Sequence, residues 1–122
     1  MVMIDNNQAQ GILSFNDKEY IAVTGGFGKG PLPSGVYQVN KPYKMKPEKG
    51  KTEAFQRTEF PWVAKLDPLF ETDRSGLYIH PDGNLPGTQG CIGILEDDTQ
   101  CFYDLNNLFK NNKQITLEVK FT

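Results

Sequence analysis

Glycine and proline recur along the whole length of this chain and limit the secondary structure that it can form. The 122 residues include 12 glycines and 8 prolines. Both residue types are unfavourable inside regular helices, so turns are expected to be frequent and long helices scarce. The length predicts one domain, covering residues 1–122, with a single modest core.

Alternation of apolar and polar residues between these turns predicts a mostly β chain. A two-residue turn joins the first two predicted strands, as in a hairpin. The strands are expected at residues 11–15, 18–24, 36–39, 60–63, 76–80 and 114–121. Between them, residues 25–35 are predicted to form a Gly/Pro-rich loop and residues 40–51 an exposed, lysine-rich arm, while 52–70 is otherwise ambiguous. Residues 91–95 are interpreted as a turn that leads into apolar structure.

One helix is expected, at residues 98–110 near the C-terminus. Cys101, Leu105 and Leu108 fall on one face of this helix, with Phe102 and Phe109 beside it. Acidic residues at 96–98 suit its N-terminus. We therefore predict a mainly β fold, a small β-sandwich or barrel-like domain with one helix in the C-terminal region.

Charge and hydropathy exclude several classes of function. The net charge is −2, which argues against a surface that binds nucleic acid by neutralising phosphates. No apolar run approaches the roughly 20 residues that span a bilayer, so no membrane insertion is expected. The first ten residues are polar and acidic and lack the pattern of a secretion signal.

Two cysteines and one histidine restrict any thiol or imidazole chemistry to few residues. They cannot build a four-thiolate zinc site or a zinc finger, and no metal or other cofactor is expected. If the chain uses a thiol nucleophile with a histidine base, the base is His80 and the nucleophile is Cys91 or Cys101.

The most informative segment is residues 75–94, where His80 ends an apolar strand and Cys91 follows after a glycine-rich loop. An imidazole beside a thiol can take its proton and leave a reactive thiolate. Glycines let the backbone approach a substrate closely. The N–H groups of Gly90, Cys91 and Ile92 can then hold the oxyanion of a tetrahedral intermediate.

At these residues the sequence resembles the L,D-transpeptidase catalytic-domain family, the YkuD-like enzymes of the cell wall. The family pairs a histidine at a strand end with a downstream Ser/Thr-x-Gly-Cys motif, here His80 and Thr88-Gln89-Gly90-Cys91. Its upstream turn and strand are matched by residues 33–37. The chain departs from many members at Gln89, where they have histidine, and at Gly93, where they have Arg or Asn. A shorter spacing between His80 and Cys91 resembles a compact subgroup of phage or secreted-effector domains.

The resemblance implies chemistry on peptidoglycan. Cys91 would attack the carbonyl between an L-configured centre and the adjacent D-amino acid of a stem peptide. The resulting thioester would be resolved by an amine, as in transpeptidation, or by water, as in an L,D-carboxypeptidase. His80 would act as general base and then as general acid, its second ring nitrogen held by the carbonyl of Pro81. Asp82 remains an alternative orienting group.

For several other residues the sequence allows either a functional or a structural role. Thr88 and Gln89 are assigned to substrate binding, and Arg74 is interpreted equally as a clamp for substrate carboxylates and as a solvated charge. For Arg57 a surface charge is favoured, and for Trp62 and Cys101 the core. Residues 82–84 are expected to form a turn. A disulfide between Cys91 and Cys101 is not expected.

Competing interpretations remain at this stage. Papain-like peptidases place the cysteine before the histidine, and sortases need an arginine after the cysteine, which this chain lacks. The alternative from another class is an inactive wall-binding or structural module on the same fold. An enzyme of this kind would act in the periplasm or cell wall, reached through export by a partner system, through release by lysis, or with a leader that is missing from this sequence. Its partner would be the stem peptide, with an immunity protein if it is an effector, and a monomer is expected.

Overall fold

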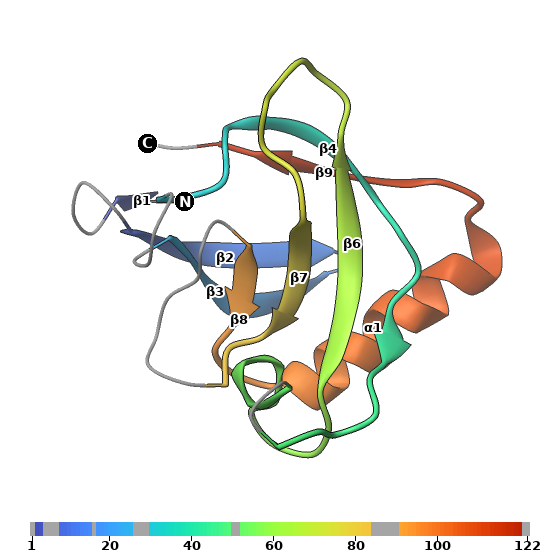
Figure 1. Ribbon diagram of the computed structural model, residues 1–122. Coiled ribbons are helices and arrows are strands. Elements are labelled where there is room, and N and C mark those ends of the chain that lie inside the picture. Colours follow the sequence, from blue (N-terminus) through green and yellow to red (C-terminus); the bar gives the residue numbers. More distant parts are fainter. Residues whose placement is uncertain are drawn as a thin grey trace.

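The computed structural model describes residues 2–3, 8–15, 17–25, 30–49, 52–83 and 91–120 (Figure 1). These residues form a mainly β structure with a single long helix near the C-terminus, which confirms the predicted fold class. In chain order the elements are β1 (Val2–Met3), β2 (Gln8–Phe15), β3 (Lys18–Gly25), β4 (Gly35–Val39), β5 (Tyr43–Lys44), the 3-10 helix η1 (Glu53–Phe55), β6 (Trp62–Pro68), β7 (Leu77–Pro81), β8 (Ile92–Ile94), the helix α1 (Asp98–Asn111) and β9 (Ile115–Val119).

The strands form one curled sheet that resembles half of a barrel (Figure 1). Its strand order is β1-β2-β3-β8-β7-β6-β4-β9, and β5 pairs with β6 outside this path. Among the strand pairs that the structure describes, β7 and β8 alone run parallel, and the others are antiparallel. This parallel pair is central to the site described below.

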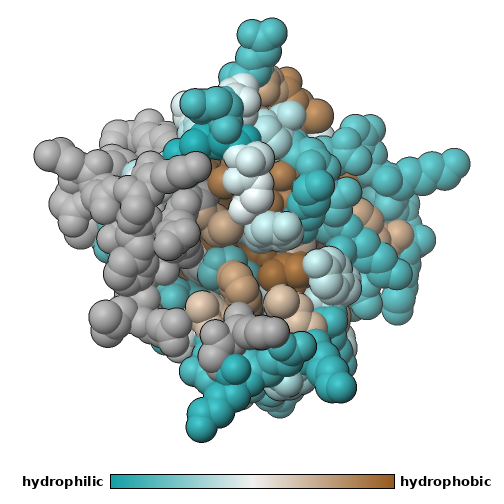
Figure 2. Space-filling view, in the orientation of Figure 1, coloured by the Kyte–Doolittle hydropathy of each residue, from teal (hydrophilic) through white to brown (hydrophobic). Residues whose placement is uncertain are grey.

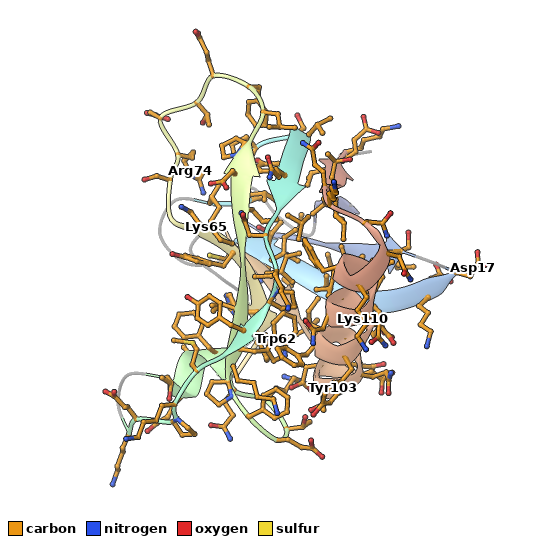
Figure 3. All side chains as sticks on the ribbon, turned by 90° about the vertical axis from the view of Figure 1, so that its right-hand side faces the viewer. Asp17, Trp62, Lys65, Arg74, Tyr103 and Lys110 are labelled. Carbon is orange, nitrogen blue, oxygen red and sulfur yellow. The ribbon has the colours of Figure 1, made fainter. Side chains whose placement is uncertain are left out.

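Alternation along the strands divides the sheet into an inner face, which packs with α1, and an outer face. Ile79 and Ile92 are paired neighbours on the inner face, and Cys101 of α1 belongs to the same core cluster. Trp62 is fully buried, and its indole N–H donates to the carbonyl of Asp98 at 3.2 Å. Figure 3 shows Trp62 between β6 and α1, so its predicted place in the core is confirmed. No helix within the described ranges has both the length and the apolar character needed to cross a bilayer.

Most predicted elements are confirmed with small shifts of their ends. The hairpin of β2 and β3, the strands β4, β7 and β9 and the helix α1 all fall where the patterns place them. The strand expected at 60–63 instead begins at Trp62 and continues to Pro68. The prediction ended too early because Lys65 and Asp67 are polar, yet they are the outward members of an alternation whose inward members are buried.

Residues 91–95 also differ from the prediction, because they contain the strand β8 rather than only a turn. All three residues of β8 are buried, and the strand lies between β3 and β7. A strand of only three residues is too short to show a clear alternation of apolar and polar residues. Its two neighbouring strands come from other parts of the chain. Its β structure is therefore a product of tertiary pairing.

Candidate active site

The parallel pairing of β7 with β8 places His80 and Cys91 on the same face of the sheet. His80 is the partner of Gly93 and Ile79 is the partner of Ile92, and paired residues of neighbouring strands point to the same side. Cys91 immediately precedes β8 and is two residues from Gly93, so it shares the outer face with His80. The usual strand spacings put the two Cα atoms about 8 Å apart, a distance that two side chains can bridge.

The His80 imidazole is buried and its orientation is fixed by the next residue. The side chain is 4% exposed, and its Nδ1 lies 2.6 Å from the carbonyl oxygen of Pro81. A carbonyl oxygen can only accept, so Nδ1 carries the proton and Nε2 presents a lone pair. Asp82, the other orienting group considered above, is buried, and its N–H donates to the carbonyl of Ile94 at 3.0 Å.

Burial lowers the pKa of His80 to about 4, and the hydrogen bond with Pro81 opposes this shift only in part. Removing the imidazole from water disfavours its charged form. At neutral pH the ring is therefore uncharged and able to accept a proton.

The Cys91 thiol is half-buried, and its Sγ donates to the carbonyl oxygen of Gly76 at 3.6 Å. Burial raises the pKa of Cys91, while a backbone hydrogen bond with Tyr78 and the charge of Arg74 act in the opposite direction. At neutral pH the Cys91 thiol is therefore protonated and donates to Gly76, and the imidazole of His80 is neutral.

Arg74 lies in the loop between β6 and β7 and belongs to the surroundings of Cys91. Its Nη1 donates to the carbonyl of Pro31 at 3.3 Å, and its guanidinium charge acts on the thiol. Figure 3 shows Arg74 and Lys65 on the side of the sheet away from α1, which is the outer face. In the view of Figure 1, apolar residues show at the centre of the surface between hydrophilic ones (Figure 2).

Comparison with known families identifies one family that matches the chain. The model of the YkuD family, described as the L,D-transpeptidase catalytic domain, matches residues 1–109. The chain belongs to the YkuD family. No curated protein and no solved structure was found to match it. The chain is thus assigned to L,D-transpeptidase-type peptidoglycan enzymes by this match over most of its length.

In this YkuD domain the glycine at position 93 lies directly beside His80. Gly93 pairs with His80 on one side and with Val23 on the other. A side chain at position 93 would project from the outer face next to the imidazole. The Arg or Asn of similar domains would occupy that place, whereas here the nearby cation comes from Arg74, in a different loop.

The structure describes only some of the other residues that were predicted to belong to the site. Thr88, Gln89 and Gly90 lie outside the described residues. Ile92 is the first residue of β8, with its side chain buried. Cys101 is fully buried in the core, and both cysteines are free thiols. The predicted place of Cys101 in the core is therefore confirmed.

The segment 52–58 contacts the site in a way that the sequence patterns did not indicate. The Phe55 ring packs edge-on against the His80 ring, with 4.8 Å between centroids and an interplanar angle of 85°. Arg57 is exposed, as expected, but its Nη1 also donates to the carbonyl of Asp82 at 2.9 Å. Residues 52–59 fell in the ambiguous stretch, because no periodicity marks a short 3-10 turn.

The structure was also searched for metal sites and for cavities outside this site. Within the ranges that the structure describes, no group of three or more His, Cys, Asp or Glu side chains is arranged to hold a metal ion. A cavity of about 150 Å³ is found at the edges of the half-barrel, lined by Ile12, Leu13, Ala22, Ile92, Leu117, Glu118, Val119 and Lys120. Its lining does not include His80 or Cys91.

Proposed function

We propose that this chain is a peptidoglycan-modifying cysteine acyl transferase in which Cys91 is the nucleophile and His80 the base. The observation that carries the proposal is the fixed tautomer of His80. Its Nδ1 is held by the carbonyl of Pro81, which leaves the lone pair on Nε2. The register of β7 and β8 puts His80 on the same face of the sheet as Cys91. Neutral general-base catalysis needs this arrangement.

The reaction begins when the Cys91 side chain rotates from Gly76 toward His80. As Sγ attacks the carbonyl carbon of the peptide bond between an L-centre and a D-amino acid, its proton passes to Nε2. The imidazolium then gives this proton to the departing amine, and the D-amino acid leaves. A thioester remains on Cys91. Attack by an acceptor amine gives a cross-link, and attack by water gives the carboxypeptidase product, with His80 again taking and returning the proton.

Backbone N–H groups are proposed to stabilise the negative charge that develops on the carbonyl oxygen during the attack. Gly90 and Ile92 flank the nucleophile in sequence and are the proposed donors. Thr88 and Gln89, on the same stretch of chain, are proposed to contact the substrate. Since a stem peptide is rich in carboxylates, Arg74 is proposed to bind one of them, and its charge already acts on the thiol.

The substrate fixes where the enzyme acts. Stem peptides belong to the peptidoglycan layer, so the proposed site of action is the periplasm or cell wall. The route by which the chain arrives there is independent of the catalytic proposal.

The test is to incubate purified protein with peptidoglycan and to analyse the muropeptides by mass spectrometry. Loss of D-alanine without new dimers indicates a carboxypeptidase, and new dimers indicate a transpeptidase. Cys91→Ala and His80→Gln are expected to reduce either activity by at least about 100-fold. Cys101→Ala is the matched control, since it removes the chain's other thiol and leaves the site intact.

Unchanged muropeptides with the wild-type protein would contradict the proposal and favour the inactive wall-binding module. Binding of the same protein to insoluble peptidoglycan distinguishes that module from a chain with no role at the wall. Equal loss of activity in Cys91→Ala and Cys101→Ala would also contradict the assignment of the nucleophile.

A further inference from the structure

We propose that the segment 52–58 positions the general base, with Phe55 fixing the plane of the His80 ring and Ala54 and Arg57 fixing the backbone that follows it. This inference rests on the proposed function of His80. It assigns a role to a part of the chain that contributes none of the proposed reacting groups.

The first contact is between the two rings. Phe55 is half-buried at the end of η1, and its ring stands nearly perpendicular to the His80 ring at 4.8 Å between centroids. An edge-to-face pair of this kind has a preferred geometry and restricts rotation of either ring. Together with the hydrogen bond between Nδ1 and Pro81, it determines the direction in which Nε2 points.

The second contact is made by the backbone of Gly83. Its N–H donates to the carbonyl of Ala54 at 3.1 Å. A Cβ atom at position 83 would lie 2.1 Å from the carbonyl oxygen of Glu53 and 2.3 Å from that of Gln56. Only glycine therefore allows this close approach of η1 to the chain that leaves β7.

The third contact comes from Arg57, whose Nη1 donates to the carbonyl of Asp82 at 2.9 Å. The segment is itself attached to α1, because the N–H and hydroxyl of Thr58 donate to the buried carboxylate of Asp98 at 3.3 and 2.9 Å. The backbone after His80 is thus connected through Arg57 and Thr58 to the start of the helix.

The same contacts keep water from the imidazole. Burial is the larger cause of the low pKa of His80, and Phe55 is one of the side chains that cover the ring. Charged or titratable side chains also occur on every element packed around His80, namely Glu53 and Arg57 on the segment 52–58, Tyr78 and Asp82 on its own stretch of chain, Lys65 on β6, Arg74 in the preceding loop and Cys91 before β8.

The chain has one histidine, so NMR can follow His80 without ambiguity. In Phe55→Ala the imidazole gains contact with water, and its pKa is expected to rise from about 4 toward the ordinary value of 6.5. Phe55→Leu retains an apolar cover and is expected to keep the pKa low. Phe15→Ala is the matched control, since Phe15 is also half-buried but stacks on Tyr20.

Arg57→Ala tests the backbone contacts with a substitution at an exposed side chain, so folding is retained. It is expected to speed exchange of the Nδ1 proton with water on the order of tenfold, because a hydrogen bond to a charged donor is lost. In Arg57→Lys the donor is partly restored, and exchange is expected to return toward the wild-type rate.

Unchanged His80 pKa in Phe55→Ala together with unchanged proton exchange in Arg57→Ala would overturn the positioning role. These readouts need no substrate. A wild-type protein without activity but with the expected NMR shifts would reject the proposed function alone, whereas an active protein without them would reject the positioning role alone.

Discussion

At the scale of single residues, the resting protonation state has the proton on the sulfur of Cys91, and the His80 ring is neutral. Burial raises the pKa of Cys91 and lowers that of His80, so both changes disfavour an ion pair at rest. In the proposed mechanism the thiol therefore stays protonated until a substrate carbonyl is in place, unlike the thiol of cysteine enzymes that hold a preformed thiolate.

The lowered pKa of His80 predicts a specific dependence of stability on pH. Between pH 6.5 and about 4 the unfolded chain binds a proton at this residue and the folded chain does not. The free energy of unfolding is therefore expected to fall by about 3 kcal/mol as the pH drops through this range. Urea unfolding at pH 7.5 and 4.5 measures it, and His80→Gln should lack this part of the loss. An equal loss in both proteins would contradict the prediction.

The two thiols are expected to differ in reactivity. Cys91 is half-buried, whereas Cys101 is fully buried and its pKa is raised by burial and by the charges of Asp104 and Asp98. Iodoacetamide should therefore modify the native protein once, at Cys91, and faster with rising pH. Peptide mapping by mass spectrometry locates the adduct. In Cys91→Ala no adduct is expected until urea is added, and rapid labelling of that variant would contradict the buried position of Cys101.

At the scale of elements, two glycines near the site are required for different reasons. Gly83 is required for space, since a Cβ atom would meet backbone oxygens of η1. Gly76 has a φ of +66°, and a Cβ atom there would meet nothing within 4 Å. The first glycine fixes how two elements pack, and the second fixes how the chain turns into β7.

Substitution at these positions separates packing from backbone conformation. Gly83→Ala is expected to destabilise the fold by about 1–3 kcal/mol, because η1 must move away from β7. Gly76→Ala is expected to cost about 1–2 kcal/mol, and Gly76→Asn less, since Asn tolerates positive φ. Thermal unfolding of the three variants measures how strongly each substitution destabilises the fold. Equal stability of Gly83→Ala and the wild type would contradict the close approach.

The elements that could be predicted from the sequence are those whose pattern is local. The helix α1 and the hairpin of β2 and β3 show their period within one continuous stretch. The strand β8 and the turn η1 do not, because their positions depend on β3, β7 and the chain around Gly83. In the site, scarcity points to His80 as the one histidine, and the motif of residues 88–91 selects Cys91 over Cys101. Phe55 could not be predicted, since no sequence pattern marks a phenylalanine that packs on an imidazole.

At the scale of the whole molecule, register decides which face carries the thiol. A glycine inserted between Cys91 and Ile92 moves the cysteine one position back along the strand direction, to the inner face. Activity is expected to fall at least about 100-fold. A glycine inserted after Asn84 leaves Cys91 next to β8 and is expected to be much less harmful. Muropeptide analysis of both variants is the measurement, and similar losses in both would contradict a site set by register.

The parallel pairing of β7 with β8 also has a consequence for how relatives of this domain are recognised. Hydrogen bonds between the two strands bring His80 and Cys91, the proposed base and nucleophile, to one face of the sheet, so the number of residues separating them in the primary structure does not measure their proximity. That stretch can differ in length without a change in the register of the two strands. Searches that demand a fixed interval would overlook compact members, and strand alignment is the sounder criterion.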